Sequence, residues 1–518
     1  MTKGREKDFI PRGQRFFELP PDAIPSSDVD REFDIAKSRF PVIYGDEQWA
    51  KPGTPTQVEP LRYALEMVRA RNPNLVEPTM FLGAWEMERE AVSMIAQLFH
   101  HPRSDEEDFN TGEKAVLGWF TDGGTGSLLQ AAWAFRNAYF RNREKGADNN
   151  FNRERDRGTV RDEGLLGLVQ RELVAAHDPP VVLASVDAHI AIDKVCDVLG
   201  LGTHNIVRYG LNKKYRTDYA ALEETIQELT KKKRKVMFTL ATAGAVNTGR
   251  VEDVQKLSKV LQKYSIDSPI IVDAAQQFMM ISLLEGYPAW DFRVEQVKAI
   301  IADPHKTDAA PYPGSVILFR DESVVHDTSN DVGYLHAGDP LGYDLKKAWM
   351  LEPSFQTSRS PIGAIATWAY FLLNGRKKLV EQYQRLYTIT QAMIAEYIKT
   401  SDHFRLLGEP QTGLVSFHLK DGDDEKAQRV YDQFVAIRDR PRFFIGFADN
   451  SRVRTIDDFK KYEKLKREHP GEKVRGYGGL SIQVMHHATE KLAEGLLEKL
   501  DQFGYEATRG KISLGGRT

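Results

Sequence analysis

Cysteine, net charge and long apolar runs are all scarce in this chain of 518 residues. Its single cysteine, Cys196, excludes an intramolecular disulfide, which fits a reducing compartment, so we expect a cytoplasmic protein. The formal net charge of −3 gives no overall field that would attract nucleic acid or an anionic membrane, and we expect neither as a partner. No apolar run approaches the roughly twenty residues of a membrane helix, and residues 1–15 lack the apolar core of a signal peptide.

The chain does have the composition of a globular protein, with 41% hydrophobic and 28% charged residues. Its length exceeds that of one ordinary core and indicates a large domain with smaller appendages. We expect an N-terminal arm at 1–80, a large domain at 81–375 and a small C-terminal α/β domain at 376–518. Because the proline-rich residues 1–60 cannot build a core of their own, we expect them to lie on the large domain or on a partner subunit.

Short apolar, β-branched runs alternate with amphipathic stretches between residues 115 and 320. Strands are expected at 181–186, 236–240, 270–273, 297–301 and 316–319. Helices are expected at 61–71, 86–99, 192–199, 254–263, 362–373 and 377–399. This alternation predicts an α/β fold whose mostly parallel sheet is covered on both faces. Ligands of such sheets bind beyond the carboxyl ends of the strands.

A lysine stands in the turn between the last two of these strands. Lys306 follows an aspartate, a proline and a histidine, and the prolines after it prevent a continuing helix. Alone, such a lysine is usually a solvated turn charge. Upstream, however, the buried strand 270–273 ends in Asp273. A carboxylate paired with a lysine that can form a Schiff base is what pyridoxal phosphate needs, so this pair favours a cofactor site.

Two further motifs fall at strand ends. A glycine-rich turn at 122–127 opens an alanine-rich helix, and the N–H groups of a helix start can hold a phosphate. His189 follows the strand at 181–186. Singly, a glycine turn is common for steric reasons and a strand-end histidine more often packs than reacts. Because both motifs fall at strand ends, together they favour a ligand site. The basic run at 230–235 is interpreted as a solvated helix end.

In this order the motifs resemble those of the group II pyridoxal-phosphate-dependent amino-acid decarboxylases, which include aromatic amino-acid, glutamate and tyrosine decarboxylases. The matching pieces are DGGTGS at 122–127, DAH at 187–189, VDAA at 272–275, DPHK at 303–306 and VGYL at 332–335. Residues 302–314 look most like the bacterial tyrosine decarboxylases. The resemblance implies the type I fold of pyridoxal-phosphate-dependent transferases, pyridoxal 5'-phosphate as cofactor, no metal, and a homodimer whose sites draw on both subunits.

The resemblance also implies roles for the residues of the catalytic centre. Lys306 would bind the cofactor aldehyde covalently, and Asp273 would keep the pyridine nitrogen protonated because a nearby anion stabilises the charged form. His189 would stack on the ring. Tyr334, on a long loop at 322–352, would protonate the α-carbon after carbon dioxide leaves. Arg359 matches a family arginine loosely, as a structural or substrate contact.

The remaining cofactor contacts would come from both sides of the ring and from the phosphate end. Ala275 would pack on the ring face opposite His189, and Gly124, Thr125 and His305 would bind the phosphate. The chain departs from the family's usual pattern beside these residues. It carries Ala245 and Val246 in place of threonines, Gln276 and Gln277 in place of small or aromatic residues and glycine, and Gly126 in place of a glutamate.

We expect α-decarboxylation of an L-amino acid to its amine, with a tyrosine-like substrate as the first hypothesis. Another carbon–carbon lyase reaction, or an aldehyde synthase that depends on decarboxylation, is the alternative, and Tyr334 argues against the synthase because phenylalanine would be expected there. A non-catalytic scaffold that binds the cofactor is the third hypothesis. Intact Lys306, Asp273 and His189 argue against the scaffold, since it has no physical need for all three.

Overall fold

The structure is a computed structural model of the whole chain. It describes residues 26–28, 30–31, 34, 58–103, 116–144, 160–170, 179–307, 309–321, 323, 325, 328, 354–437, 445–484 and 488–509. Tyr334 and most of the loop at 322–352 lie outside the described residues, as does most of the arm at 1–57. In the described part of the chain, no helix combines the length and the apolar character of a membrane span.

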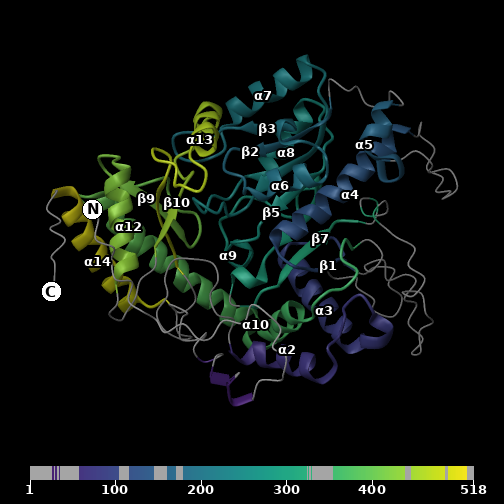
Figure 1. The fold of residues 1–518 in the computed structure, drawn as a ribbon, viewed down its shortest axis with the longest axis horizontal. Helices are drawn as coiled ribbons and strands as arrows, with labels where there is room; N and C mark the ends of the chain where they lie inside the picture. Colours follow the sequence, from purple (N-terminus) through teal and green to yellow (C-terminus); the bar gives the residue numbers. More distant parts are fainter. Residues whose placement is uncertain are drawn as a thin grey trace.

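A seven-stranded sheet forms the centre of the larger part of the molecule (Figure 1). Its strands lie in the order β1 (Leu117–Thr121), β7 (Ser315–Phe319), β6 (Val297–Ala302), β5 (Ile270–Asp273), β4 (Val236–Thr242), β2 (Val181–Ser185) and β3 (Ile206–Tyr209). β7 runs antiparallel to β1 and β6, and the other neighbours are parallel. The expected mostly parallel α/β sheet is therefore confirmed, and all strands except β7 end at the same edge.

Alternate residues of the central strands pack into different cores on the two faces of this sheet. In β5, Ile270 and Val272 belong to one cluster of buried side chains, whereas Ile271 between them belongs to another. Successive side chains of a strand point to opposite faces, so a strand covered on both sides reads as a continuous apolar run. This explains why the sequence shows runs rather than alternation in these strands.

Helices cover both faces of the large sheet. The helices that precede β1 in the chain or lie between the strands of this sheet are α2 (Val58–Arg71), α3 (Pro78–Leu98), α4 (Gly124–Glu144), α5 (Val160–Gln170), α6 (Ala191–Val198), α7 (Tyr219–Lys231), α8 (Val254–Lys263) and α9 (Phe278–Leu283). α8 has the bounds expected from the sequence: Asp253 caps its N-terminus and Leu257 and Leu261 are buried. The edge strand β3 was not expected, whereas α7 ends within the basic run that the sequence analysis interprets as a helix end.

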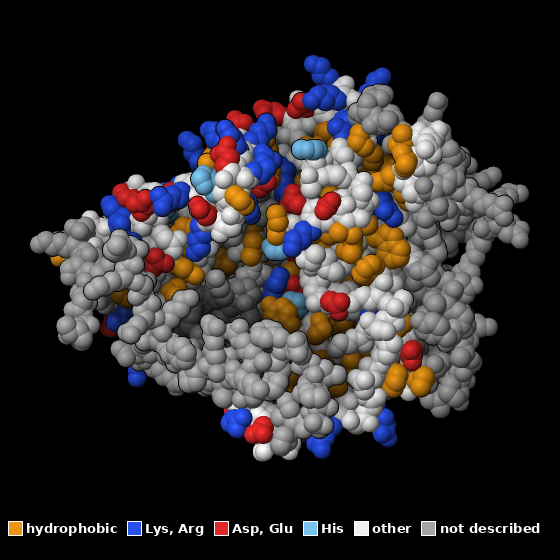
Figure 2. Space-filling model, in the orientation of Figure 1, with side chains coloured by type: hydrophobic (Ala, Val, Ile, Leu, Met, Phe, Trp, Pro, Cys, Tyr) orange, Lys and Arg blue, Asp and Glu red, His pale blue; other side chains and the backbone are white. Residues whose placement is uncertain are grey.

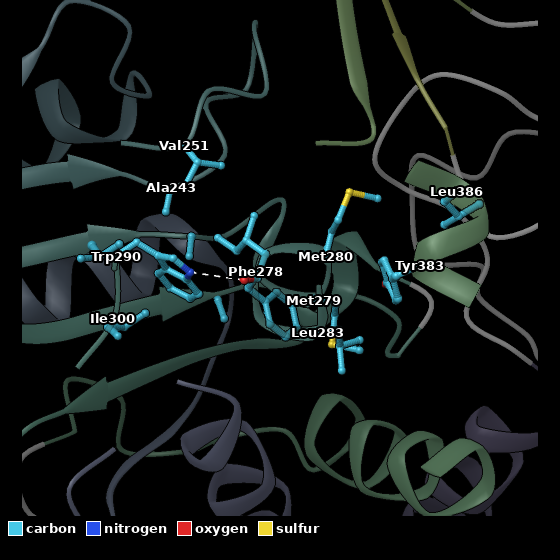
Figure 3. Close-up of a cluster of buried hydrophobic side chains, with 14 of the residues drawn as sticks. Ala243, Val251, Phe278, Met279, Met280, Leu283, Trp290, Ile300, Tyr383 and Leu386 are labelled. Carbon is cyan, nitrogen blue, oxygen red and sulfur yellow. Dashed lines mark hydrogen bonds between the residues drawn. The ribbon is translucent and has the colours of Figure 1, made fainter. Parts of the chain in front are cut away.

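The turn after Asp273 is anchored in the core by α9 (Figure 3). Phe278 and Met279 are fully buried, and the indole N–H of Trp290 donates to the Ile281 carbonyl at 3.4 Å. Figure 3 also shows Tyr383, from α10, approaching Met280. This packing fixes the backbone immediately downstream of the strand end that carries Asp273.

A second, four-stranded sheet lies in the C-terminal part of the chain. Its strands follow the order β10 (Gly446–Ala448), β11 (Gly479–Gln483), β9 (Leu414–Leu419) and β8 (Phe404–Leu406), and all neighbours are antiparallel. It is accompanied by α12 (Asp424–Ala436), α13 (Ile456–Glu468) and α14 (Glu490–Arg509). This is the smaller α/β unit expected from the sequence, although the domain bounds at 80 and 375 stay predictions.

A long helix connects the two sheets (Figure 1). α10 (Ile362–Thr388) is kinked at Gly375 and continues through a π-helical segment, Ile389–Ala395, into α11 (Glu396–Thr400). The sequence predicts separate helices at 362–373 and 377–399. The structure agrees with a break between them, because Gly375 has a φ of +63° and a ψ of 163°, outside the helical region.

Candidate active site

A cavity of about 440 Å³ opens at the edge of the large sheet where the carboxyl ends of its parallel strands meet. Asp122, His189, Thr242, Asp273 and Asp303 each stand at or just beyond the end of a different strand and line it. Figure 2 shows this side of the molecule hollowed near its centre, with histidine, basic and acidic side chains gathered there. The structure also brings the sequence-predicted site residues to this cavity: Gly124, Thr125, His189, Asp273, Ala275, His305 and Lys306.

Lys306 reaches the cavity from a short 3-10 helix, Pro304–Lys306, between β6 and β7. Its Nζ lies 2.8 Å from Oδ2 of Asp303, whose side chain is fully buried. Burial alone would lower the pKa of the Lys306 ammonium, but the negative charges of Asp303 and Asp273 raise that pKa above its usual value. The two carboxylates therefore hold the lysine as a cation.

Asp303 was part of the sequence motif but had no role in the sequence analysis. Burial alone would raise the pKa of its carboxyl, yet the charge of Lys306 and the nearby His305 ring hold this pKa below its usual range. Because residues three apart lie on the same side of a 3-10 helix, the spacing of Asp303 and Lys306 was the signal that could have found the pair.

Asp273 and His189 face the same cavity from the ends of β5 and β2, the two strands that flank β4. Oδ1 of Asp273 accepts a hydrogen bond from the backbone N–H of Ala275 at 3.1 Å, and burial raises the pKa of this carboxyl despite the opposing charge of Lys306. Nδ1 of His189 accepts from the backbone N–H of Ala191 at 3.2 Å, which fixes the ring. Burial lowers the pKa of His189, so the ring is neutral and suits contact with an aromatic face.

His305 is wedged between Asp303 and a tyrosine that the sequence analysis missed. Its Nδ1 accepts from the backbone N–H of Gly314 at 3.1 Å, and its Nε2 lies 3.4 Å from Oδ2 of Asp303. The ring of Tyr312 packs over it with centroids 4.0 Å apart. Tyr312 is 58% exposed and lines the cavity, which puts a phenol at its mouth near Lys306.

The glycine-rich turn at 122–127 begins helix α4, so its first backbone N–H groups have no partner within the helix. Gly124 is pressed against Asp303, because a Cβ on Gly124 would lie 2.7 Å from Asp303 Oδ2. Such a helix start suits a phosphate group. Thr242 also lines the cavity, and its buried Oγ1 has no hydrogen-bond partner among the described residues.

These features together fit pyridoxal phosphate. Lys306 offers an amine, Asp273 an anion for the ring nitrogen, His189 and Ala275 offer surfaces for the ring, and the start of α4 offers donors for the phosphate. The residue roles inferred from the sequence remain proposals. The proton donor expected at Tyr334 lies outside the described residues.

The residues that depart from the family's usual pattern lie beside the site and pack against one another or against the C-terminal sheet. Gly244 has a φ of +101°, and a Cβ there would lie 2.5 Å from the Cβ of Gln277. Nε2 of Gln276 donates to Oε1 of Gln483, at the end of β11, at 2.5 Å. The two glutamines therefore fill space beside the turn at 244–246 and connect the cavity wall to the C-terminal sheet.

Arg359 does not line the cavity. Its buried guanidinium forms an ion pair with Glu88 of α3 and donates to the carbonyl of Phe120 at 3.2 Å. Of the two roles expected for this arginine, the geometry favours the structural one, which joins the start of α10 to α3 and β1.

Comparison with known proteins relates this site to one enzyme family. The pyridoxal-dependent decarboxylase conserved domain matches residues 169–420. The chain is 25% identical over 371 residues to a probable L-tyrosine/L-aspartate decarboxylase of Methanosarcina acetivorans, covering 71% of this chain and 80% of the relative. It is 26% identical over 351 residues to an L-aspartate decarboxylase of Thermococcus kodakarensis, covering 66% and 72%.

Solved structures share the fold at lower identity. Lactobacillus brevis glutamate decarboxylase superposes with a TM-score of 0.69 at 16% identity, over 96% of both chains. Catharanthus roseus tryptophan decarboxylase gives 0.69 at 15% identity, over 96% of this chain and 91% of that one. The family match, the relatives and the lysine-centred cavity all support one family for this chain, the pyridoxal-phosphate-dependent amino-acid decarboxylases.

Proposed function

We propose that this enzyme removes the α-carboxyl group of an aromatic L-amino acid, with tyrosine as the first candidate, at the cavity around Lys306. The observation that supports this most directly is the position of Lys306 between Asp303 and Asp273 at the strand-end cavity. Bound pyridoxal phosphate supplies an electron-accepting ring for the electron pair that a leaving carboxyl group releases.

The chain's own residues would bind the cofactor and handle protons. Lys306 would hold it covalently until the substrate amine takes its place, and Asp303 would then receive the freed ammonium. Asp273 would keep a positive charge on the ring nitrogen. His189 would hold the ring flat from one side, and Tyr334 would deliver a proton to the α-carbon.

The charges around the cavity support an aromatic rather than an acidic substrate. No arginine lines the cavity among the described residues, and the ammonium of Lys306 is already paired with Asp303. A buried substrate carboxylate would need its own cationic partner. Val246 and Tyr312 are partly exposed at the cavity and offer surfaces for a neutral ring. An acidic amino acid is the second candidate, because several relatives are named for L-aspartate.

Incubation of the purified holoenzyme with a panel of L-amino acids tests this proposal. The panel contains tyrosine, tryptophan, phenylalanine, aspartate and glutamate, and both carbon dioxide and amine are measured. We expect equal amounts of the two products, with tyrosine the best substrate. Aldehyde formed with consumption of oxygen would indicate the synthase reaction instead, and turnover of aspartate alone would select the second candidate. Bound cofactor without any product would favour the scaffold.

We also propose that the enzyme is a cytoplasmic homodimer. Helices α2 and α10 pack against each other and carry exposed leucines at Leu65, Leu372 and Leu373, with exposed fractions between 45% and 58%. These leucines offer apolar surface that a second subunit would cover. The N-terminal arm also needs a surface on which to lie, and a second subunit would provide one.

A further inference from the structure

Arg250 lies at the centre of a buried network of charged and hydroxyl side chains. Its Nη2 and Nε donate to the two oxygens of Asp187 at 2.7 and 2.9 Å. Its Nη1 donates to Oγ1 of Thr217 at 3.0 Å and lies 3.6 Å from Oε1 of Glu252. The side chains of Arg250, Asp187 and Glu252 are at most 4% exposed, so this bidentate pair is shielded from water.

Both partners of the pair belong to segments that line the cavity. Asp187 stands two residues before His189, in the turn that follows β2. The backbone carbonyl of Arg250 accepts from the N–H groups of Gly244 and Ala245 at 2.8 and 2.9 Å. The ion pair therefore fixes the histidine turn and the Gly244 turn relative to each other.

Glu252 extends the same network toward Asp273. Its Oε2 accepts from the backbone N–H of Thr242 at 3.1 Å, and Thr242 lines the cavity. The next residue, Ala243, donates its N–H to the carbonyl of Asp273 at 2.8 Å. Three segments that line the cavity, from β2, β4 and β5, are thus joined by one cluster. The side chains of this cluster, Asp187, Arg250 and Glu252, do not themselves line the cavity.

The energetics of the Arg250–Asp187 pair indicate that it positions the segments it joins and contributes little to the stability of the fold. Burial alone would raise the pKa of Asp187, but the charge and hydrogen bonds of Arg250 hold that pKa below its usual value. A buried ion pair recovers little more than its own desolvation cost, and replacing both charges with neutral groups is often harmless to the fold. A forked arginine–carboxylate pair does fix the distance and angle between the segments it joins.

We propose that Arg250 is a positioning residue of the cofactor site, whose pair with Asp187 sets where His189 and the Gly244 turn lie against pyridoxal phosphate. The inference rests on the proposed function of this cavity. It adds to that function a buried ion pair that positions the cofactor site, although neither of its side chains lines the cavity.

The test compares three variants with the wild-type protein by thermal unfolding, by the Kd of pyridoxal phosphate and by circular dichroism in the visible band of the bound cofactor. The double variant Asp187→Asn/Arg250→Met removes the pair without changing the net charge of the cluster. Arg250→Lys keeps the charge but loses the fork. The matched control Asp424→Asn/Arg452→Met makes the same replacements at an ion pair of 3.3 Å in the C-terminal part, away from the cavity.

We expect the double variant to fold, to bind the cofactor roughly tenfold to a hundredfold more weakly and to lose visible dichroism, the scale seen when residues that orient a metal ligand are removed. Arg250→Lys should show a smaller loss, and the control should keep the wild-type Kd and dichroism. A folded double variant with wild-type values overturns the proposal. If the double variant does not fold, Arg250→Lys decides in the same way, and failure of both to fold overturns a positioning role in favour of a structural one.

The wild-type protein separates this inference from the function on which it rests. Wild-type protein that binds no pyridoxal phosphate overturns the proposed function itself. Wild-type binding together with unchanged variants overturns only the role of Arg250.

Discussion

Asp303 and Lys306 face each other across one turn of a 3-10 helix, with Nζ of the lysine 2.8 Å from Oδ2 of the aspartate. Gly124, at the start of α4, lies against the same carboxylate, where a Cβ would come within 2.7 Å of Oδ2. The expected phosphate site and the expected covalent site are therefore coupled through one buried carboxylate. A shift of either segment would move the other.

This coupling predicts different effects for two alanine substitutions in the same turn. Gly124→Ala should force its methyl group into Asp303 and weaken cofactor binding by about tenfold or more, since overpacking of a buried site costs about 1–3 kcal/mol. Gly126→Ala is the matched control, because its Cβ would find its nearest neighbour at 3.9 Å. Titration of both apo-proteins with pyridoxal phosphate measures the difference, and equal Kd values would contradict the coupling.

Lys306→Ala tests the covalent site itself. The wild-type protein should be yellow and show the visible absorption of a cofactor bound through a lysine, because Lys306 is the cavity's amine among the described residues. The variant should lose that band while the protein stays folded, as judged by far-ultraviolet circular dichroism. A colourless wild-type protein after reconstitution with excess cofactor would refute the whole interpretation.

Asp303→Asn should shift the pH dependence of cofactor attachment. Asp303 raises the pKa of Lys306, so its removal should lower that pKa. An amine must lose its proton before it attacks an aldehyde, and the pH midpoint of attachment to the apo-protein should therefore move downward. The rise of visible absorbance measured at a series of pH values gives this midpoint. A midpoint that stays or rises would show that Asp303 does not stabilise the ammonium. Asp122→Asn, which removes another carboxylate that lines the cavity, should leave the midpoint unchanged.

The same carboxylate should contribute to stability in a defined range of pH. The pKa of Asp303 is lower in the folded protein than in the unfolded chain, where an aspartate has a pKa of about 3.9. Its contribution is therefore present above that value and is lost as the pH falls through the folded pKa. Asp303→Asn should lower the unfolding temperature at neutral pH, and the difference from wild type should shrink in acid.

The sequence predicted those parts of the fold that depend on local patterns. Apolar runs located the central strands, and the spacing of Leu257 and Leu261 located α8. The sequence analysis missed β3 because its four residues include Arg208 and two half-buried side chains, so the strand has no continuous apolar run. The gap left between the expected helices at 362–373 and 377–399 contains Gly375, and the backbone does leave the helical region there, with a φ of +63°.

The site was predictable where a motif carries chemistry and not where distant segments meet. Strand-end motifs identified Lys306, Asp273 and His189. The pair of Asp187 and Arg250 joins residues 63 positions apart, and the contact of Gln276 with Gln483 spans 207. Neither separation leaves a local pattern, because these contacts depend on how the strands and the two sheets are arranged.

Tyr334→Phe, compared with Tyr312→Phe, tests which phenol delivers the proton. Tyr334 is the donor that the family resemblance implies, whereas Tyr312 is the phenol that the described structure places at the cavity, over His305 and near Lys306. Loss of a general acid should reduce amine formation by roughly a hundredfold or more, while cofactor binding stays intact because the expected cofactor contacts lie elsewhere. We expect Tyr334→Phe to show that loss and to release carbon dioxide in excess of amine, and Tyr312→Phe to change amine output much less. If the two variants behave the opposite way, Tyr312 is the donor. If neither loses activity, the proton comes from another group, with His189, His336 and Tyr343 as the remaining candidates.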